Sequence, residues 1–203
     1  MNLLESDGLW TWARSLDDYT IPYGKENGGN FTDVGSKIHS FKYSDQTSEK
    51  DKDQIVSYFA KRIMKLIKEE LSGFFPSPPF DVCVAVPSNR PGTRSLPTEI
   101  CSSIEIDNRH IRNGSAGIVK KQSGVVMKNI PNSERSERLV GLYSIDSENM
   151  PKVKKKGFLV IDDVIETGES TKAICKVLKN AYPERNIYVV ILANIFTTKK
   201  YLK

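Results

Sequence analysis

The stretch from Phe158 to Lys172 constrains the fold of this 203-residue chain more than any other. It begins with an apolar run, Phe158–Ile161, which ends in two adjacent acids, Asp162 and Asp163. A short apolar run rich in Val and Ile predicts a buried strand of a parallel sheet. Because ligands of such sheets bind at the carboxyl ends of the strands, the two acids are expected at a binding site.

The polar loop after the acids has the composition of an anion-binding turn. Gly168 permits a tight backbone turn, and the start of the following helix exposes N–H groups that favour an anion. Asp162 and Asp163 suit the vicinal hydroxyls of a sugar or a hydrated Mg2+ ion. These features predict a pocket for a ribose 5-phosphate. The structural alternative is an ordinary strand–turn–helix unit with a charged turn.

The segment Val160–Thr171, VIDDVIETGEST, closely resembles the phosphoribosyl pyrophosphate binding motif of type I phosphoribosyltransferases. The resemblance implies an α/β fold, with a central, mostly parallel sheet flanked by helices and a small variable hood. It implies one domain over residues 1–203, with the core at 81–195 and the hood or an N-terminal extension at 1–50. The implied reaction transfers ribose 5-phosphate to a nitrogenous base and releases pyrophosphate, with Mg2+ as cofactor.

The resemblance also implies roles for individual residues. Asp162 and Asp163 would hold the ribose hydroxyls, directly or through water bound to Mg2+. Glu166 would be a general base for a purine-like acceptor, or else a solvent-facing acid. The 5-phosphate would be bound by Thr167, Gly168, Glu169, Ser170 and Thr171, the pyrophosphate by Ser88, Asn89, Arg90, Gly92 and Arg94, and a mobile loop would contribute Lys120, Lys121 or Lys128.

Apolar runs and helical spacing predict the remaining elements. Further strands are expected at 81–87 and 187–193, and a short strand or strand pair at 31–43. Helices are expected at 55–71, with a cap at Asp51 or Asp53, at 96–106, and after the motif as far as Tyr182. The aromatic residues of the first 23 positions would stack on the acceptor base, belong to the core, or form an oligomer contact.

The composition bears on which ligands the chain could bind and on the cell compartment in which it is expected. The net charge of +5 fits an anionic small molecule, and it also fits nucleic acid, although no nucleic-acid-binding module is legible. Cys83, Cys101 and Cys175 are far apart and are expected to be buried and unpaired. No membrane-spanning stretch and no signal peptide are seen, so the default location is the cytoplasm. Relatives are often dimers, so a homodimer is compatible with the resemblance.

Two details resemble the ComF-type branch, which is associated with bacterial DNA uptake. They are Val86-Pro87 and the segment 134–143, ERSERLVGLY, in which Arg138 stands where that branch has Asn. The zinc ribbon of many members and their first-loop sequence are absent. A non-catalytic regulator that binds phosphoribosyl pyrophosphate or nucleotides and a ComF-like DNA-uptake accessory protein are therefore alternatives to the enzyme. A hydrolase of phosphoribosyl groups is a third alternative, without a recognisable nucleophile.

Overall fold

The computed structural model describes residues 8–19, 31–75, 77–88, 93–121, 141–154, 156–165 and 168–195. The described elements are strands and helices mixed along the chain. In chain order they are β1 (Trp12–Asp18), α1 (Asp33–Tyr43), α2 (Glu49–Leu71), β2 (Val82–Ala85), α3 (Leu96–Asp107), β3 (Arg112–Asn113), the 3-10 turn η1 (Ser115–Gly117), β4 (Ile118–Lys120), β5 (Tyr143–Ile145), β6 (Gly157–Ile165), α5 (Glu169–Ala181) and β7 (Asn186–Asn194).

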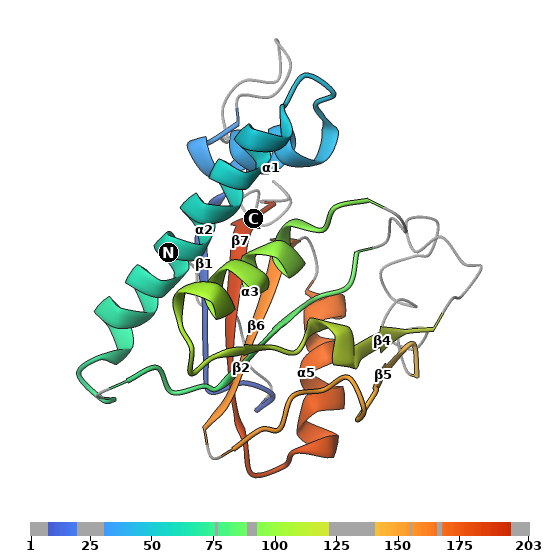
Figure 1. Cartoon of the computed structure of the whole chain (residues 1–203). Helices are drawn as coiled ribbons and strands as arrows, with labels where there is room; N and C mark the ends of the chain where they lie inside the picture. The colour runs from blue at the N-terminus through green and yellow to red at the C-terminus, as the bar shows by residue number, and fades with distance from the viewer. Residues whose placement is uncertain are drawn as a thin grey trace, which may run out of the picture.

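The main sheet has five strands in the order β1-β7-β6-β2-β3, and all of its pairings are parallel. Figure 1 shows β6 and β7 at its centre, with their carboxyl ends at the top of the view. A separate two-stranded antiparallel sheet joins β4 and β5. The fold is thus α/β with a mostly parallel central sheet flanked by helices, as the sequence predicts.

Two hydrophobic cores lie on opposite faces of the main sheet. Leu159 and Ile161 of β6 belong to the core formed with α1, α2 and α3, whereas Phe158 and Val160 belong to the core formed with α5. This alternation follows from the two-residue period of a strand. Because both faces are covered, the central strands are apolar at nearly every position, which explains why they were recognisable in the sequence.

The predicted strands at 81–87, 158–161 and 187–193 are confirmed, and β6 is longer than its apolar run. It continues through Asp162 and Asp163 to Ile165, because residues 162, 164 and 165 still pair with β7. The predicted helix at 96–106 is α3, with a proline in its first turn, and α5 has its C-cap at Tyr182.

The strand or strand pair predicted at 31–43 is wrong, because this segment contains the helix α1. The Thr32 hydroxyl caps the helix by accepting a hydrogen bond of 2.9 Å from the N–H of Gly35. Val34, Ile38 and Phe41 are buried at intervals of four and three residues, which is helical spacing. The short length of the segment hid this period in the sequence.

The long helix α2 begins six residues earlier than expected, at Glu49 rather than residue 55. Its cap is Ser48 and not Asp51 or Asp53, since the Ser48 hydroxyl accepts the N–H of Asp51 at 3.1 Å and donates to the Asp51 carboxylate at 2.6 Å. Asp51 therefore completes the cap from within the first turn. This early start brings Glu49 and Lys52 to the edge of the cavity described below.

Part of the expected hood region belongs to the main sheet. The edge strand β1 pairs with β7 from Trp12, opposite Tyr188, to Asp18, opposite Asn194. Trp10 is buried in the core on the α5 side. The boundary of the hood at residue 50 stays a prediction.

Cys83, Cys101 and Cys175 are buried and unpaired, as the sequence predicts. Within the described residues, no helix is both long and apolar enough to cross a membrane.

Candidate functional site

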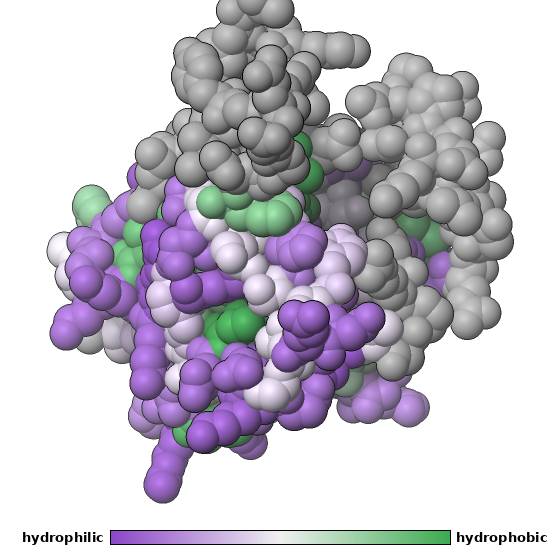
Figure 2. Space-filling model, turned by 90° about the horizontal axis from the view of Figure 1, so that it is seen from above, coloured by the Kyte–Doolittle hydropathy of each residue, from purple (hydrophilic) through white to green (hydrophobic). Residues whose placement is uncertain are grey.

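A cavity of about 510 Å³ lies beside the carboxyl ends of β2 and β6. Figure 2 views the molecule from the side at which the strands of the sheet end, and on the coloured part of that surface hydrophilic residues surround small hydrophobic patches. The walls of the cavity come from α1, the start of α2, the segment after β2, the end of β6 and the start of α5. The lining residues are Phe41, Lys42, Tyr43, Glu49, Lys52, Val86, Pro87, Ser88, Thr93, Arg94, Ser95, Leu96, Asp162, Asp163, Val164 and Ser170.

Asp162 is a buried carboxylate at the floor of this cavity. One oxygen accepts the Thr171 hydroxyl at 2.8 Å, and the other accepts the Asp163 N–H at 2.9 Å. Burial and, to a smaller extent, the charge of Asp163 raise the pKa of Asp162 to about 7, although the hydrogen bond from Thr171 opposes this shift. Asp162 therefore changes charge near neutral pH, as groups at functional sites often do.

Asp163 forms an ion pair with Lys42, a residue in the last turn of α1. The side chains are 18% and 27% exposed, respectively, so the pair is accessible from the cavity without being fully solvated. No sequence motif points to Lys42. Its only local signal is a basic residue at a helix end, and the pairing requires α1 and β6 to meet in the folded chain.

The start of α5 adjoins the two acids. Gly168 is the N-cap and has a φ of 77°, a left-handed conformation that favours glycine. Ser170 lines the cavity, and its side chain hydrogen-bonds to the Tyr143 hydroxyl. Thr171 is 1% exposed and donates to Asp162, so its hydroxyl supports the acid from behind. Glu169 occupies the first helical turn.

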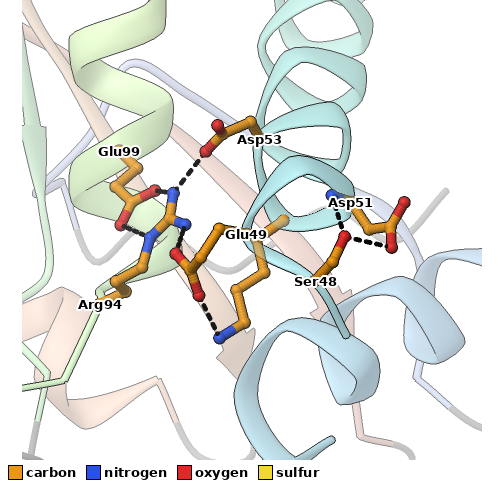
Figure 3. A network of polar contacts seen from close by, with 7 residues as sticks. Ser48, Glu49, Asp51, Asp53, Arg94 and Glu99 are labelled. Atoms are coloured by element: carbon orange, nitrogen blue, oxygen red, sulfur yellow. Dashed lines mark hydrogen bonds and ion pairs between the residues drawn. The ribbon is translucent and has the colours of Figure 1, made fainter. Parts of the chain in front are cut away.

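Figure 3 shows the arrangement around Arg94, which lies between β2 and α3. Its guanidinium donates to both carboxylate oxygens of Glu99 on α3 and forms ion pairs with Glu49 and Asp53 on α2. These contacts, above all the one with Glu99, raise the pKa of Arg94 further above its usual range. The guanidinium also lies over the Phe41 ring, 5.5 Å from its centre.

The other predicted loop residues are only partly described. Ser88 lines the cavity. Lys120 lies in β4, and its ammonium is 5.9 Å from the centre of the Tyr143 ring, while the backbone N–H of Lys121 donates to Leu142. Burial lowers the pKa of Lys120. The predicted residues that lie outside the described ones are Asn89, Arg90, Gly92, Lys128, Glu166 and Thr167, together with residues 134–140 of the ComF-like segment.

A row of aromatic rings runs from Tyr43, at the cavity wall, away along α1. Tyr43 packs against His39 with ring centres 5.3 Å apart, His39 against Phe31 at 4.7 Å, and Phe31 against Tyr19 at 5.3 Å. Tyr43 is 50% exposed. A half-exposed ring beside the acid pair offers a flat apolar surface to a ligand.

The donor set of the acid pair fits only one kind of magnesium binding. No group of three or more His, Cys, Asp or Glu side chains in the described part of the chain could hold a metal ion. Both Asp162 oxygens already accept protein hydrogen bonds, and Asp163 forms an ion pair with Lys42. The residues therefore fit a hydrated ion that arrives with the ligand's phosphates, and they do not fit an ion held by the protein alone.

The chain was compared with protein families, with curated proteins and with solved structures. Residues 112–202 match the model of the phosphoribosyl transferase domain family. One solved structure that the chain resembles is the Helicobacter pylori xanthine-guanine-hypoxanthine phosphoribosyltransferase. Its identity is 16% and its TM-score 0.39, over 74% of this chain and 86% of that one. No protein with a curated description matches significantly.

The matched region contains β6, the acid pair and α5, which form one side of the cavity. The parallel sheet carries these groups at its carboxyl edge, as the binding motif requires. The chain therefore resembles the phosphoribosyl transferase domain family over residues 112–202, and this matched part contains the binding motif recognised in the sequence.

Proposed function

We propose that the chain transfers ribose 5-phosphate from phosphoribosyl pyrophosphate to a nitrogen of an aromatic base and releases pyrophosphate. The observation that carries this proposal is the cavity that brings together the acid pair, the first turn of α5 and the loop after β2. In this proposal the acid pair accepts hydrogen bonds from the sugar hydroxyls, and the first turn of α5 and the loop after β2 each bind an anion, all within the same cavity. A ligand with a phosphate, a ribose and a pyrophosphate has the matching order of groups.

The 5-phosphate is assigned to the first turn of α5. The N–H groups of a first helical turn have no intrahelical partner, and the helix dipole favours an anion there. Gly168 turns the chain tightly into this helix, and Ser170 adds a hydroxyl at the cavity wall. The predicted role of Thr171 changes in this proposal, because its hydroxyl supports Asp162 while its backbone N–H remains in the first turn.

The ribose hydroxyls are assigned to Asp163 and Asp162. Asp162 is held by Thr171 and by the Asp163 N–H, so its orientation is set before a ligand binds. Rigid placement of the ribose lowers the entropic cost of reaching the transition state. Magnesium carried by the pyrophosphate would neutralise part of the charge that develops on the leaving group.

The pyrophosphate is assigned to the loop that begins at Ser88. Arg94 receives a positioning role in this proposal, because its guanidinium already contacts Glu49, Asp53 and Glu99. Arg94 contacts acids of both α2 and α3, and it therefore holds in place the point at which the chain enters α3. The predicted contact between Arg94 and pyrophosphate would require it to leave these three carboxylates.

The acceptor base is assigned to the side of the cavity formed by Tyr43. Tyr43 is half exposed there and is backed by His39. Stacking on such a ring suits a flat heterocycle. The proposed general base Glu166 and the purine preference derived from it remain predictions, as do the cytoplasmic location and the homodimer.

A pyrophosphate-release assay with a panel of purine and pyrimidine bases tests this function. We expect release with one class of base only. Asp163→Asn should reduce the rate by about 10²-fold or more, which is typical for loss of a transition-state contact. The matched control is Asp33→Asn, which changes an exposed acid on α1 outside the cavity. Binding of phosphoribosyl pyrophosphate without release for any base would instead indicate a regulator.

A further inference from the structure

The ion pair between Lys42 and Asp163 places a fixed positive charge at the predicted ribose site. Lys42 comes from α1 and Asp163 from β6, so two elements far apart in the sequence build the contact. Both side chains line the cavity. A half-buried ion pair at this position is part of the binding surface, and any ribose that reaches Asp163 also meets the Lys42 ammonium.

Lys42 differs in its surroundings from the two other cationic side chains of the cavity wall. Lys52 pairs with Glu49 at 3.0 Å, and Arg94 contacts the acids of the same cluster. That cluster, Glu49, Asp53, Glu99, Lys52 and Arg94, carries three negative and two positive charges. Its cations are therefore already balanced by acids, and the ion pair of Lys42 is with the ribose-site acid itself.

The charge balance at the acid pair explains what Lys42 contributes. Asp162 and Asp163 are adjacent, and two neighbouring carboxylates repel one another as well as an incoming phosphate. An opposite charge at close range offsets this repulsion more strongly in a half-buried site than in water. In sugar-phosphate sites a divalent cation can supply that charge, whereas here an ammonium already occupies a carboxylate oxygen of Asp163.

We propose that Lys42 is a positioning residue that acts as the resident counter-charge of the ribose site and allows a ribose 5-phosphate group to bind without a divalent cation. This inference rests on the proposed function, since it assumes that the acid pair receives the ribose. Lys42 holds the Asp163 carboxylate in place and leaves its remaining lone pairs for the ribose hydroxyls. Magnesium is then required for the pyrophosphate part of the substrate and not for the ribose 5-phosphate part.

Calorimetric titration with ribose 5-phosphate, in EDTA and in excess Mg2+, tests the proposal. For the wild-type protein the two dissociation constants should agree within a factor of about two. Lys42→Met should weaken binding in EDTA by about tenfold, the size of one charge-assisted interaction, and Mg2+ should restore most of the loss. Lys42→Arg, which keeps the charge, should bind like the wild type in EDTA.

The matched control is Lys37→Met on the same helix. Lys37 also forms an ion pair, with Asp33 at 2.5 Å, but it does not line this cavity. Its substitution should leave both dissociation constants unchanged. A circular dichroism melt of each variant, run beside the titrations, separates loss of binding from loss of folded protein.

Three results would overturn the proposal. The first is wild-type binding of ribose 5-phosphate that requires Mg2+. The second is a Lys42→Met variant that binds in EDTA as tightly as the wild type or more tightly, which would make Lys42 a bystander or a competitor of the ligand. The third is no wild-type binding of ribose 5-phosphate or of phosphoribosyl pyrophosphate in either buffer, which overturns the proposed function as well.

Discussion

The hydroxyl of Thr171 in α5 donates a 2.8 Å hydrogen bond to the carboxylate of Asp162 in β6. Both residues are buried, and the contact closes the turn between the strand that carries the acids and the helix proposed to bind the phosphate. Thr171 stands in the segment that resembles a phosphate-binding motif, yet its hydroxyl supports the carboxylate of Asp162. The contact couples the two halves of the proposed site.

Replacement of Thr171 should destabilise the fold through this contact. Thr171→Val keeps the shape but leaves a buried carboxylate without one donor, so unfolding should become easier by about 1–3 kcal/mol. Urea denaturation measures the change. Thr171→Ser, which retains the hydroxyl, is the control and should lose much less. Equal stability of the two variants would show that the hydrogen bond has no energetic role.

The raised pKa of Asp162 predicts an unusual pH dependence of stability. Its folded pKa is about 7 and its usual value 3.8, so the folded state holds this proton more tightly than the unfolded state. The resulting stabilisation is complete below about pH 3.8 and is lost as the pH rises towards 7. The difference in unfolding free energy between wild type and Asp162→Asn should therefore fall over this range.

Asp33→Asn is the control for the pH experiment. A hydrogen bond from Lys37 lowers the pKa of Asp33, so the stabilisation from Asp33 is present at neutral pH and is lost on acidification. The difference between wild type and Asp33→Asn should rise with pH, opposite to that for Asp162→Asn. Parallel pH profiles for wild type and Asp162→Asn would contradict the raised pKa.

The contact between Arg94 and Glu99 should show measurable coupling in a double-mutant cycle. The guanidinium meets Glu99 through two nitrogens, which favours a defined geometry. With Arg94→Met and Glu99→Gln we expect a coupling of up to about 1 kcal/mol, because the pair is partly exposed. The control pair, Arg112 and Glu105 at 3.6 Å, is more exposed and should show almost none. Equal coupling in both pairs would contradict the positioning role of Arg94.

Gly168→Ala should cost about 1–2 kcal/mol, since a left-handed conformation disfavours a residue with a Cβ. The new Cβ would also lie 2.9 Å from Cδ1 of Ile165. The control is Gly73→Ala, where a Cβ would meet nothing within 4 Å and φ is not left-handed. Thermal unfolding of the two variants checks the difference, and equal losses would rule out strain at Gly168.

The parts of the fold that were predictable depend on local patterns. The strands β2, β6 and β7 are apolar runs because both sheet faces are covered. The two acids that follow Ile161 predict the position of the candidate site from the sequence alone. The edge strand β1 mixes Arg14, Ser15 and Asp17 with apolar residues, so no such run identifies it. Helix α1 has too weak a sequence signal to be predicted, because only three apolar positions define its period.

The parts of the site that were not predictable depend on tertiary contacts. Lys42 meets Asp163 only because α1 packs at the carboxyl edge of the sheet, and no motif contains both residues. The sequence likewise predicts that Arg94 faces an anion. In the structure Glu49 and Asp53 approach it from the first turns of α2, which lie before the predicted start of that helix. Motifs identify the groups that a ligand needs, and the fold decides which of them already have partners.

The most direct test of the proposed ligand is a thermal shift with phosphoribosyl pyrophosphate, with and without Mg2+. At about one hundred times the dissociation constant a ligand stabilises the folded state by about 2.7 kcal/mol. For a chain of this size the midpoint should rise by about 5–10 °C. We predict such a rise for the wild type and its loss in the double variant Asp162→Asn/Asp163→Asn. No shift in the wild type, or an equal shift in the double variant, would contradict the assignment of the ribose to this acid pair.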